Sequence, residues 1–175
     1  NCAWTIQKDA GTRWKALFER PRGQRREDTA DGRCAWAGRT KIMGVNTMQN
    51  HMELTFDSIS QNESFARAVA AAFATQLNPT LAELSDIRTA ISEAVTNAIV
   101  HGYSNNGTKK VYMSCDIRGD VFEATVIDEG KGMENVSLAM QPFYTTMPGT
   151  ERSGMGFSVM EAFMDGLVVE STPGR

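Results

Sequence analysis

Apolar and polar positions alternate regularly from Met48 onward, and the first pattern predicts a strand. Residues 51–59, HMELTFDSI, place Met52, Leu54 and Phe56 on one side of an extended segment. Because successive side chains of a strand point to opposite faces, this strand should bury one face against a core.

Helical spacing follows in two segments. The first, residues 60–77, starts at Ser60 and has Glu63 three positions later, which predicts a capping box. An Asn-Pro step interrupts the pattern, and a longer helix is predicted over residues 80–102. Six of its apolar residues fall within one arc of about 140°, the width of a core-facing stripe: Ile87, Ile91, Ala94, Val95, Ala98 and Ile99.

The rest of the pattern predicts a hairpin, a loop, a helix and a last strand. Two strands, 110–117 and 121–128, flank a Gly-containing turn. Residues 129–153 are loop-like, and 156–166 and 167–172 have the spacing of a helix and a strand. The order β-α-α-β-β-loop-α-β predicts one sheet with helices packed on it.

The first 47 residues show no sustained period of 2 or 3.6, and we expect no packed domain there. They hold all three tryptophans and ten Lys or Arg against five Asp or Glu, whereas the remainder holds eight against sixteen. A basic arm for nucleic acid or another anionic partner is one interpretation. The favoured one is a disordered extension, or extraneous sequence upstream of a start at Met48 or Met52. The domain is therefore expected to span 48–175.

Composition narrows the class of protein further. With 175 residues, 41% of them hydrophobic, the chain is expected to form one soluble globular domain. It contains neither an apolar run of 18 residues nor the layout of a secretory signal, so we expect a cytoplasmic protein with no membrane contact. Cys2, Cys34 and Cys115 lie far apart beside only two histidines, which favours free thiols over a zinc site or disulfides.

Candidate chemistry begins in SEAVTNAIVHG, where Glu93, Asn97 and His101 follow one line along the edge of the apolar stripe. A helix rises about 1.5 Å per residue, so Glu93 and Asn97 lie about 6 Å apart along the axis. This spacing suits a magnesium phosphate site, with the amide oxygen on the cation and the carboxylate orienting or deprotonating the attacking group. From these residues alone, the favoured alternative is an exposed Glu, a hydrogen-bonded Asn and a helix-end His.

Two glycine-containing segments add to this candidate. In IDEGKGM, Asp128 ends a strand and could accept from an exocyclic amine such as that of adenine, while Gly130 and Gly132 permit close backbone approach. A plain Gly-rich turn explains the same letters. In ERSGMGFSVMEAFM, Gly154 and Gly156 precede a helix whose free N–H groups could hold a phosphate. The spacing matches neither a P-loop nor a Rossmann fingerprint.

The order E-x-x-x-N, D-x-G-x-G, G-x-G resembles the ATP-binding fold shared by gyrase, Hsp90, histidine kinases and MutL. Four longer stretches, SQNESFARA, ISEAVTNAIVHGY, DEGKGM and ERSGMGFSVMEAFMD, are similar to the anti-sigma F factor family of spore-forming bacteria, also called stage II sporulation protein AB. The resemblance runs from Met48 to the end of the chain. It implies an α+β fold: a two-layer α/β sandwich with a mixed, mostly antiparallel sheet and helices packed on one face.

The resemblance also implies roles for single residues. Glu93 matches the catalytic base, Arg152 an arginine that reaches the γ-phosphate, and Asn97 the magnesium ligand. Arg67, on the first helix, matches an arginine that contacts both protein partners. The loop 133–153 corresponds to a lid over the nucleotide. The nucleotide-binding positions match Asn97, Asp128, Gly130, Gly132, Thr145, Thr146, Ser153, Gly154, Met155, Gly156 and Phe157.

The family implies a homodimer that binds and inhibits a sporulation sigma factor and uses Mg-ATP to phosphorylate a serine of an anti-anti-sigma protein. Two alternatives remain open: a nucleotide-dependent sigma-binding module without phosphoryl transfer, and a histidine-kinase catalytic domain. The last is weakened because no phosphoacceptor helix precedes the domain. The family continues past the position of Arg175 into a closing strand, so we expect the domain to be truncated there.

Overall fold

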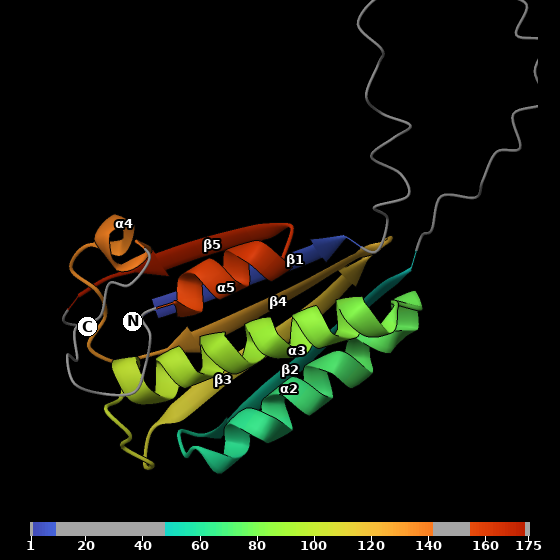
Figure 1. Ribbon diagram of the computed structural model, residues 1–175. Coiled ribbons are helices and arrows are strands. Elements are labelled where there is room, and N and C mark those ends of the chain that lie inside the picture. The colour runs from blue at the N-terminus through green and yellow to red at the C-terminus, as the bar shows by residue number, and fades with distance from the viewer. Residues whose placement is uncertain (1, 10–47, 142–154, 174–175) are drawn as a thin grey trace, which may run out of the picture.

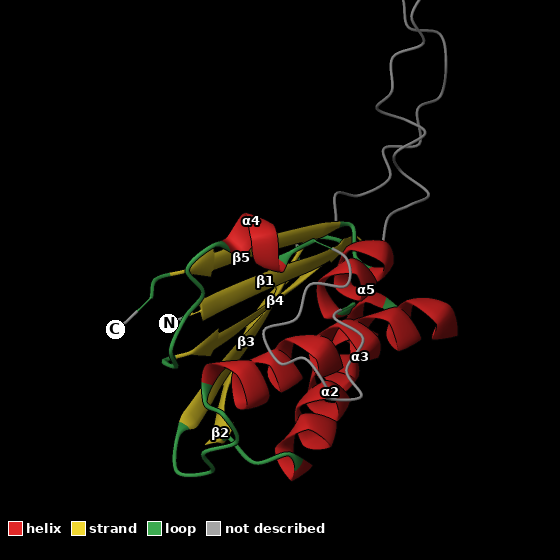
Figure 2. Cartoon of the chain, turned by 60° about the vertical axis from the view of Figure 1, so that its left-hand side comes forward, coloured by secondary structure: helices red, strands yellow, loops and turns green. Residues whose placement is uncertain are grey.

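The computed structural model describes residues 2–9, 48–141 and 155–173, which form a five-stranded sheet with helices on one face (Figure 1). The strand order is β2-β3-β4-β1-β5, and all four neighbouring pairs are antiparallel. Figure 2 shows the resulting two layers, with the sheet on one side and α2, α3 and α5 on the other. The predicted α+β class is confirmed. The strands are β1 (Cys2–Asp9), β2 (Gln49–Asp57), β3 (Lys110–Arg118), β4 (Val121–Asp128) and β5 (Gly166–Ser171).

Helices follow the predicted order, with bounds that differ at their ends. They are α2 (Gln61–Ala74), the 3-10 turn η1 (Thr75–Leu77), α3 (Leu81–Thr96), the π-helical segment η2 (Asn97–Gly102), α4 (Val136–Ala139) and α5 (Gly156–Phe163). The short helix α4 lies in a segment predicted to be loop. The predicted apolar stripe of α3 and η2 is confirmed, because all six of its residues are at most 2% exposed and join the core beneath the sheet.

The capping box lies on a different helix from the one predicted. Ser60 precedes α2 in a helical conformation and makes no side-chain capping bond. Its expected partner, Glu63, instead pairs with Arg67 at 3.4 Å and accepts a hydrogen bond from Ser92. The capping box forms at α3. The Thr80 hydroxyl accepts a hydrogen bond from Glu83 N, and the Glu83 carboxylate accepts one from Thr80 N.

The expectation for the first 47 residues is wrong for residues 2–9. This segment is β1, which lies in the sheet between β4 and β5. Cys2, Trp4 and Ile6 alternate inward and are at most 4% exposed. Three apolar residues at period 2, next to a long basic segment, are too short a pattern to predict a strand. Their burial depends on the neighbouring strands β4 and β5, which are distant in sequence. Residues 10–47 lie outside the described ranges.

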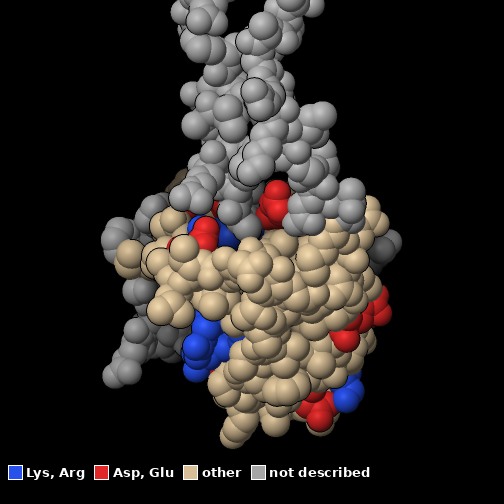
Figure 3. Space-filling view, turned by 90° about the vertical axis from the view of Figure 1, so that its right-hand side faces the viewer, with Lys and Arg blue, Asp and Glu red and all other residues tan. Residues whose placement is uncertain are grey.

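The surface of the described chain gives little indication of a binding partner. None of its helices has the length and apolarity needed to cross a bilayer. On the face shown in Figure 3, charged side chains form small separate groups on a largely uncharged surface. Two of the three thiols, Cys2 and Cys115, are buried and free, while Cys34 lies outside the described residues.

Candidate functional site

The start of α5 packs directly against the polar edge of α3. Glu93 and Asn97 are partly buried at the α3–η2 junction. A Cβ placed on Gly156 would lie 2.8 Å from Glu93 Oε2 and 3.7 Å from Asn97 Nδ2. A Cβ at this position would displace the Glu93 carboxylate, so glycine leaves that carboxylate beside the start of α5. The fold thus unites a carboxylate, an amide and the positive end of a helix.

Asn97 has an unused polar atom at this junction. Its Nδ2 is buried and has no hydrogen-bond partner in the described part of the protein. Such a group costs about 1–3 kcal/mol, which a ligand or water can recover. Because a half-turn of the amide exchanges its nitrogen and oxygen, the same position can present an oxygen to a cation. Asn97 also opens the π-helical segment, a distortion frequent at functional sites.

Asp128 supplies a second buried polar group at the end of β4. The residue is 1% exposed. Its Oδ1 accepts from Gly130 N at 2.8 Å, and its Oδ2 has no partner within the described residues. Burial raises the pKa of this carboxyl, and the hydrogen bond from Gly130 opposes the rise. A buried acceptor without a donor is the feature that an amine-bearing ligand would satisfy.

Backbone contact between η2 and the loop after β4 joins the two parts of the site. A Cβ on Gly130 would lie 2.2 Å from the Gly102 carbonyl oxygen, so the two backbones touch where no side chain fits. Lys131 N donates to the same carbonyl at 3.1 Å. A Cβ on Gly102 would lie 2.6 Å from Asp128 Oδ1. The helix that carries Asn97 therefore ends against the buried carboxylate.

Known proteins have sequences similar to this chain over most of its length. Residues 59–175 match the histidine kinase-like ATPase domain family. The anti-sigma F factor of Thermoanaerobacter sp. (strain X514) is 58% identical over 126 residues, which cover 72% of this chain and 87% of the relative. Those of Priestia megaterium and Anoxybacillus flavithermus are each 56% identical, over 71% of this chain and 86% and 85% of their own lengths. The chain belongs to the anti-sigma F factor family. Its ATPase domain implies that it binds a nucleotide.

The anti-sigma F resemblance assigned more residues than the described site contains. Met155 directly precedes α5, makes no side-chain capping bond and is 38% exposed, and the Phe157 ring lies 5.0 Å from that of Trp4. Arg67 lies on α2, where it pairs with Glu63 and lines the same groove as Glu93. Gly132 has a left-handed backbone with φ of 72° and packs against the Thr172 carbonyl. Their roles remain predictions, as do those of five residues outside the described ranges: Thr145, Thr146, Arg152, Ser153 and Gly154.

Sequence reasoning missed three residues of this region. Gly102 was interpreted only as a helix end, although its backbone packs against the loop after β4 and accepts a hydrogen bond from it. Cys2 and Trp4 lie on β1, in the segment interpreted as a leader. The sequence signal that could have revealed this strand is the period-2 spacing of the apolar residues Cys2, Trp4 and Ile6. The pairing of β1 with β4 and β5 could not be inferred from any local pattern.

The described residues contain no group of three His, Cys, Asp or Glu side chains placed to hold a metal. Magnesium commonly binds through one or two protein oxygens together with substrate phosphates and water. Asn97, with its unsatisfied amide beside the helix end, fits that limited contribution. A magnesium ion bound here would neutralise phosphate charge.

Proposed function

We propose that this chain is an anti-sigma factor that binds a sporulation sigma factor and, with Mg-ATP, phosphorylates a serine of an anti-anti-sigma protein. The curated relatives are named anti-sigma F factors, and their names support the sigma-factor partner. That partner also supports action in the cytoplasm. The contact of Gly156 with Glu93 and Asn97 carries the proposal, since it brings the residues proposed as base and cation ligand to a helix end that could bind phosphate.

Each site residue has one proposed task. The Asp128 carboxylate accepts from the exocyclic amine of adenine, which satisfies its unpartnered Oδ2. Asn97 turns its amide oxygen to magnesium, and the first N–H groups of α5 bind phosphate oxygens. Glu93 takes the proton of the substrate serine as its oxygen bonds to the γ-phosphorus; the bond from that phosphorus to the β–γ bridging oxygen breaks, and ADP leaves with the electron pair.

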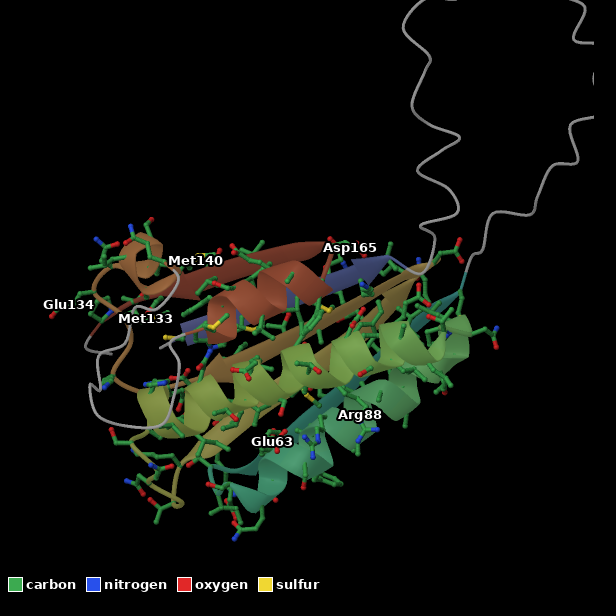
Figure 4. All side chains as sticks on the ribbon, viewed as in Figure 1. Glu63, Arg88, Met133, Glu134, Met140 and Asp165 are labelled. Carbon is green, nitrogen blue, oxygen red and sulfur yellow. The ribbon has the colours of Figure 1, made fainter. Side chains whose placement is uncertain are left out.

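A groove between α2 and α3 supports the proposed partner contact of Arg67. The groove encloses about 570 Å³ and is lined by Arg67 and Arg88 together with several hydroxyl side chains. Glu93 is the last α3 residue along it. Figure 4 labels Glu63 and Arg88 along these two helices. A serine-bearing segment with acidic residues would place its acids on the arginines and its hydroxyl toward Glu93.

The open face of the sheet supports the proposed homodimer. Tyr112 and Ile127 are paired neighbours on β3 and β4, and they are 37% and 40% exposed on the side away from the helices. Val168 of β5 faces the same side and is 57% exposed. These apolar side chains cross several strands, so a second copy could bury them.

The proposed reaction is tested by incubating the full chain with γ-labelled ATP, magnesium and the anti-anti-sigma protein. We expect label on a partner serine. Glu93→Gln should lower the transfer rate about 100-fold or more while ATP binding persists, as expected for loss of a general base. Glu161→Gln, an exposed substitution of the same kind on α5, should leave the rate unchanged.

Three results would contradict parts of this proposal. ATP binding without label on the partner would favour the nucleotide-dependent sigma-binding module. Full transfer by Glu93→Gln would remove Glu93 from the role of base. Label on a histidine of the chain itself would favour the histidine-kinase alternative.

A further inference from the structure

Strand β1 lies at the centre of the contacts that shape the nucleotide site, although it lies outside the family match at 59–175. It is paired with β4 on one side and β5 on the other (Figure 1). Cys2 stands opposite both Asp128 and Ser171. Among the described strands, β5 pairs with β1 alone, at the edge of the sheet. The register of β1 therefore decides where β5 lies relative to the buried carboxylate.

This register also holds the loop that follows Asp128. The Ser171 hydroxyl accepts from Met133 N at 2.7 Å and lies 3.1 Å from the Cys2 thiol. The loop is thus tied at one end to Gly102, through Lys131 N, and at the other to β5. Displacement of β1 would release the second tie.

Both ends of α5 are held by β1 as well. The Trp4 ring packs on Phe157 near the start of the helix. At the other end, Lys8 Nζ donates to the Phe163 carbonyl at 2.7 Å, and Asp165 N donates to the Gln7 carbonyl at 3.0 Å. Figure 4 labels Asp165 at this end, beside β1. Because Gly156 lies against Glu93, a shift of α5 on β1 would move the start of the helix beside the proposed base.

Trp4 joins the two halves of this arrangement. It is 3% exposed and two residues along β1 from Cys2, so it faces the same side of the sheet as Asp128. Its indole N–H is near enough to oppose the rise in the pKa of Asp128, yet Trp4 Nε1 and Asp128 Oδ2 each lack a hydrogen bond in the described structure. The ring therefore contacts α5 and faces the buried carboxylate.

We propose that β1 is a positioning strand of the nucleotide site, with Trp4 as its coupling residue, so that bound nucleotide and docked β1 stabilise each other. The proposal rests on nucleotide binding by the ATPase domain. A ligand that binds only the protein with β1 docked in the sheet lowers the population of the form with β1 released. By linkage, that population falls by the factor 1 + [L]/Kd, where [L] is the free ligand concentration.

The thiol of Cys2 reports on docking in the unmodified full chain. It is 4% exposed when β1 is docked, whereas Cys115 is 0% exposed in β3 and reports on global unfolding. Alkylation of the two cysteines is followed by peptide mapping, with and without ATP and magnesium. We expect Cys2 to react faster than Cys115, and to slow about tenfold or more at a ligand concentration about 100 times Kd. A Cys2 rate that ignores bound nucleotide, or that merely equals the Cys115 rate, overturns the proposal.

Substitutions on the two faces of β1 test the coupling residue. Trp4→Ala should weaken ATP binding, measured by equilibrium dialysis, about threefold to tenfold, as expected for a lost aromatic contact. At the same ATP concentration it should also lower the protection of Cys2 by about the same factor. Trp4→Phe keeps a ring on Phe157 and should restore most of both. Thr5→Ala removes the Thr5–Thr125 contact of 3.1 Å on the opposite face and should leave ATP affinity unchanged.

Outcomes separate this inference from the proposed function. Unchanged ATP affinity in Trp4→Ala, with Cys115 still protected, overturns the role of Trp4 while nucleotide binding stands. If Trp4→Ala exposes Cys115, the variant has unfolded, and the alkylation of the unmodified chain decides. Failure of the unmodified chain to bind ATP would refute the proposed function itself.

Discussion

At the residue scale, Asp128 combines nearly complete burial with a carboxyl oxygen that has no partner among the described residues. Its raised pKa means that the folded protein holds this proton to higher pH than the unfolded chain does. Stability contributed by the protonated form is therefore lost as pH rises from the ordinary carboxyl pKa of 3.8 through the folded pKa. At neutral pH the ionised carboxylate opposes folding of the free protein.

Asp128→Asn should make the free protein more stable at neutral pH. The amide oxygen can still accept from Gly130 N, and no charge is buried. The stability difference between variant and parent should grow as pH rises above 3.8 and level off beyond the folded pKa of Asp128. Urea unfolding at several pH values measures it. A difference that does not change with pH would contradict this assignment.

The same substitution should weaken ATP binding about tenfold or more, since the new NH₂ group faces an amine donor where a carboxylate accepted. The sequence could propose a contact between Asp128 and adenine, but it could not show that the carboxyl group is buried with one oxygen unpartnered. The motif D-x-G-x-G gives a carboxylate followed by glycines. Only the tertiary structure, in which Gly102 packs on the loop and β1 pairs with β4, buries Asp128 and leaves one oxygen unsatisfied.

At the scale of elements, two helix starts with the same sequence signature behave differently. Thr80 and Glu83 form a complete capping box at α3, whereas Ser60 makes no capping bond at α2. Thr80→Ala should therefore lower the free energy of unfolding by about 1 kcal/mol. Ser60→Ala, the matched control, should change it by less than about 0.5 kcal/mol. Chemical denaturation of both variants measures the difference, and equal losses would contradict it.

Local signals predicted the elements themselves well, because apolar spacing reflects which face each element must bury. The stripe from Ile87 to Ile99 was correct throughout. Competition between side chains was not visible locally: Glu63 binds Arg67 and Ser92 instead of its own helix start. The π-helical turn at Asn97 was missed for a similar reason, since its apolar spacing also fits an α-helix.

At the scale of the whole molecule, one face of the sheet carries no helix of the described chain, and this face is the surface on which we propose the homodimer. Ile127 lies on the central strand of this face, near the end of β4, between Tyr112 of β3 and Ala3 of β1. Ile127→Glu should shift a dimer toward monomer by about tenfold or more in Kd, because a charge would be buried in the interface. Sedimentation velocity over a concentration series measures the shift.

Leu81→Glu provides the control for that shift. Leu81 is 87% exposed at the start of α3, on the helical layer, so its replacement should leave the association constant unchanged. A dimer that survives Ile127→Glu but dissociates with Leu81→Glu would place the interface on the helices instead.

The sequence by itself determined the order of the strands and of the longer helices from Met48 onward, the buried faces of β2 and α3, and the candidate set Glu93, Asn97 and Asp128. Spacing and residue chemistry are local properties, so a single chain carries them. Tertiary structure alone decided that Gly156 meets Glu93, that Gly102 closes on the Asp128 loop, and that β1 completes the sheet. Those contacts join residues far apart in sequence, and their free energy exists only when both partners are already in place.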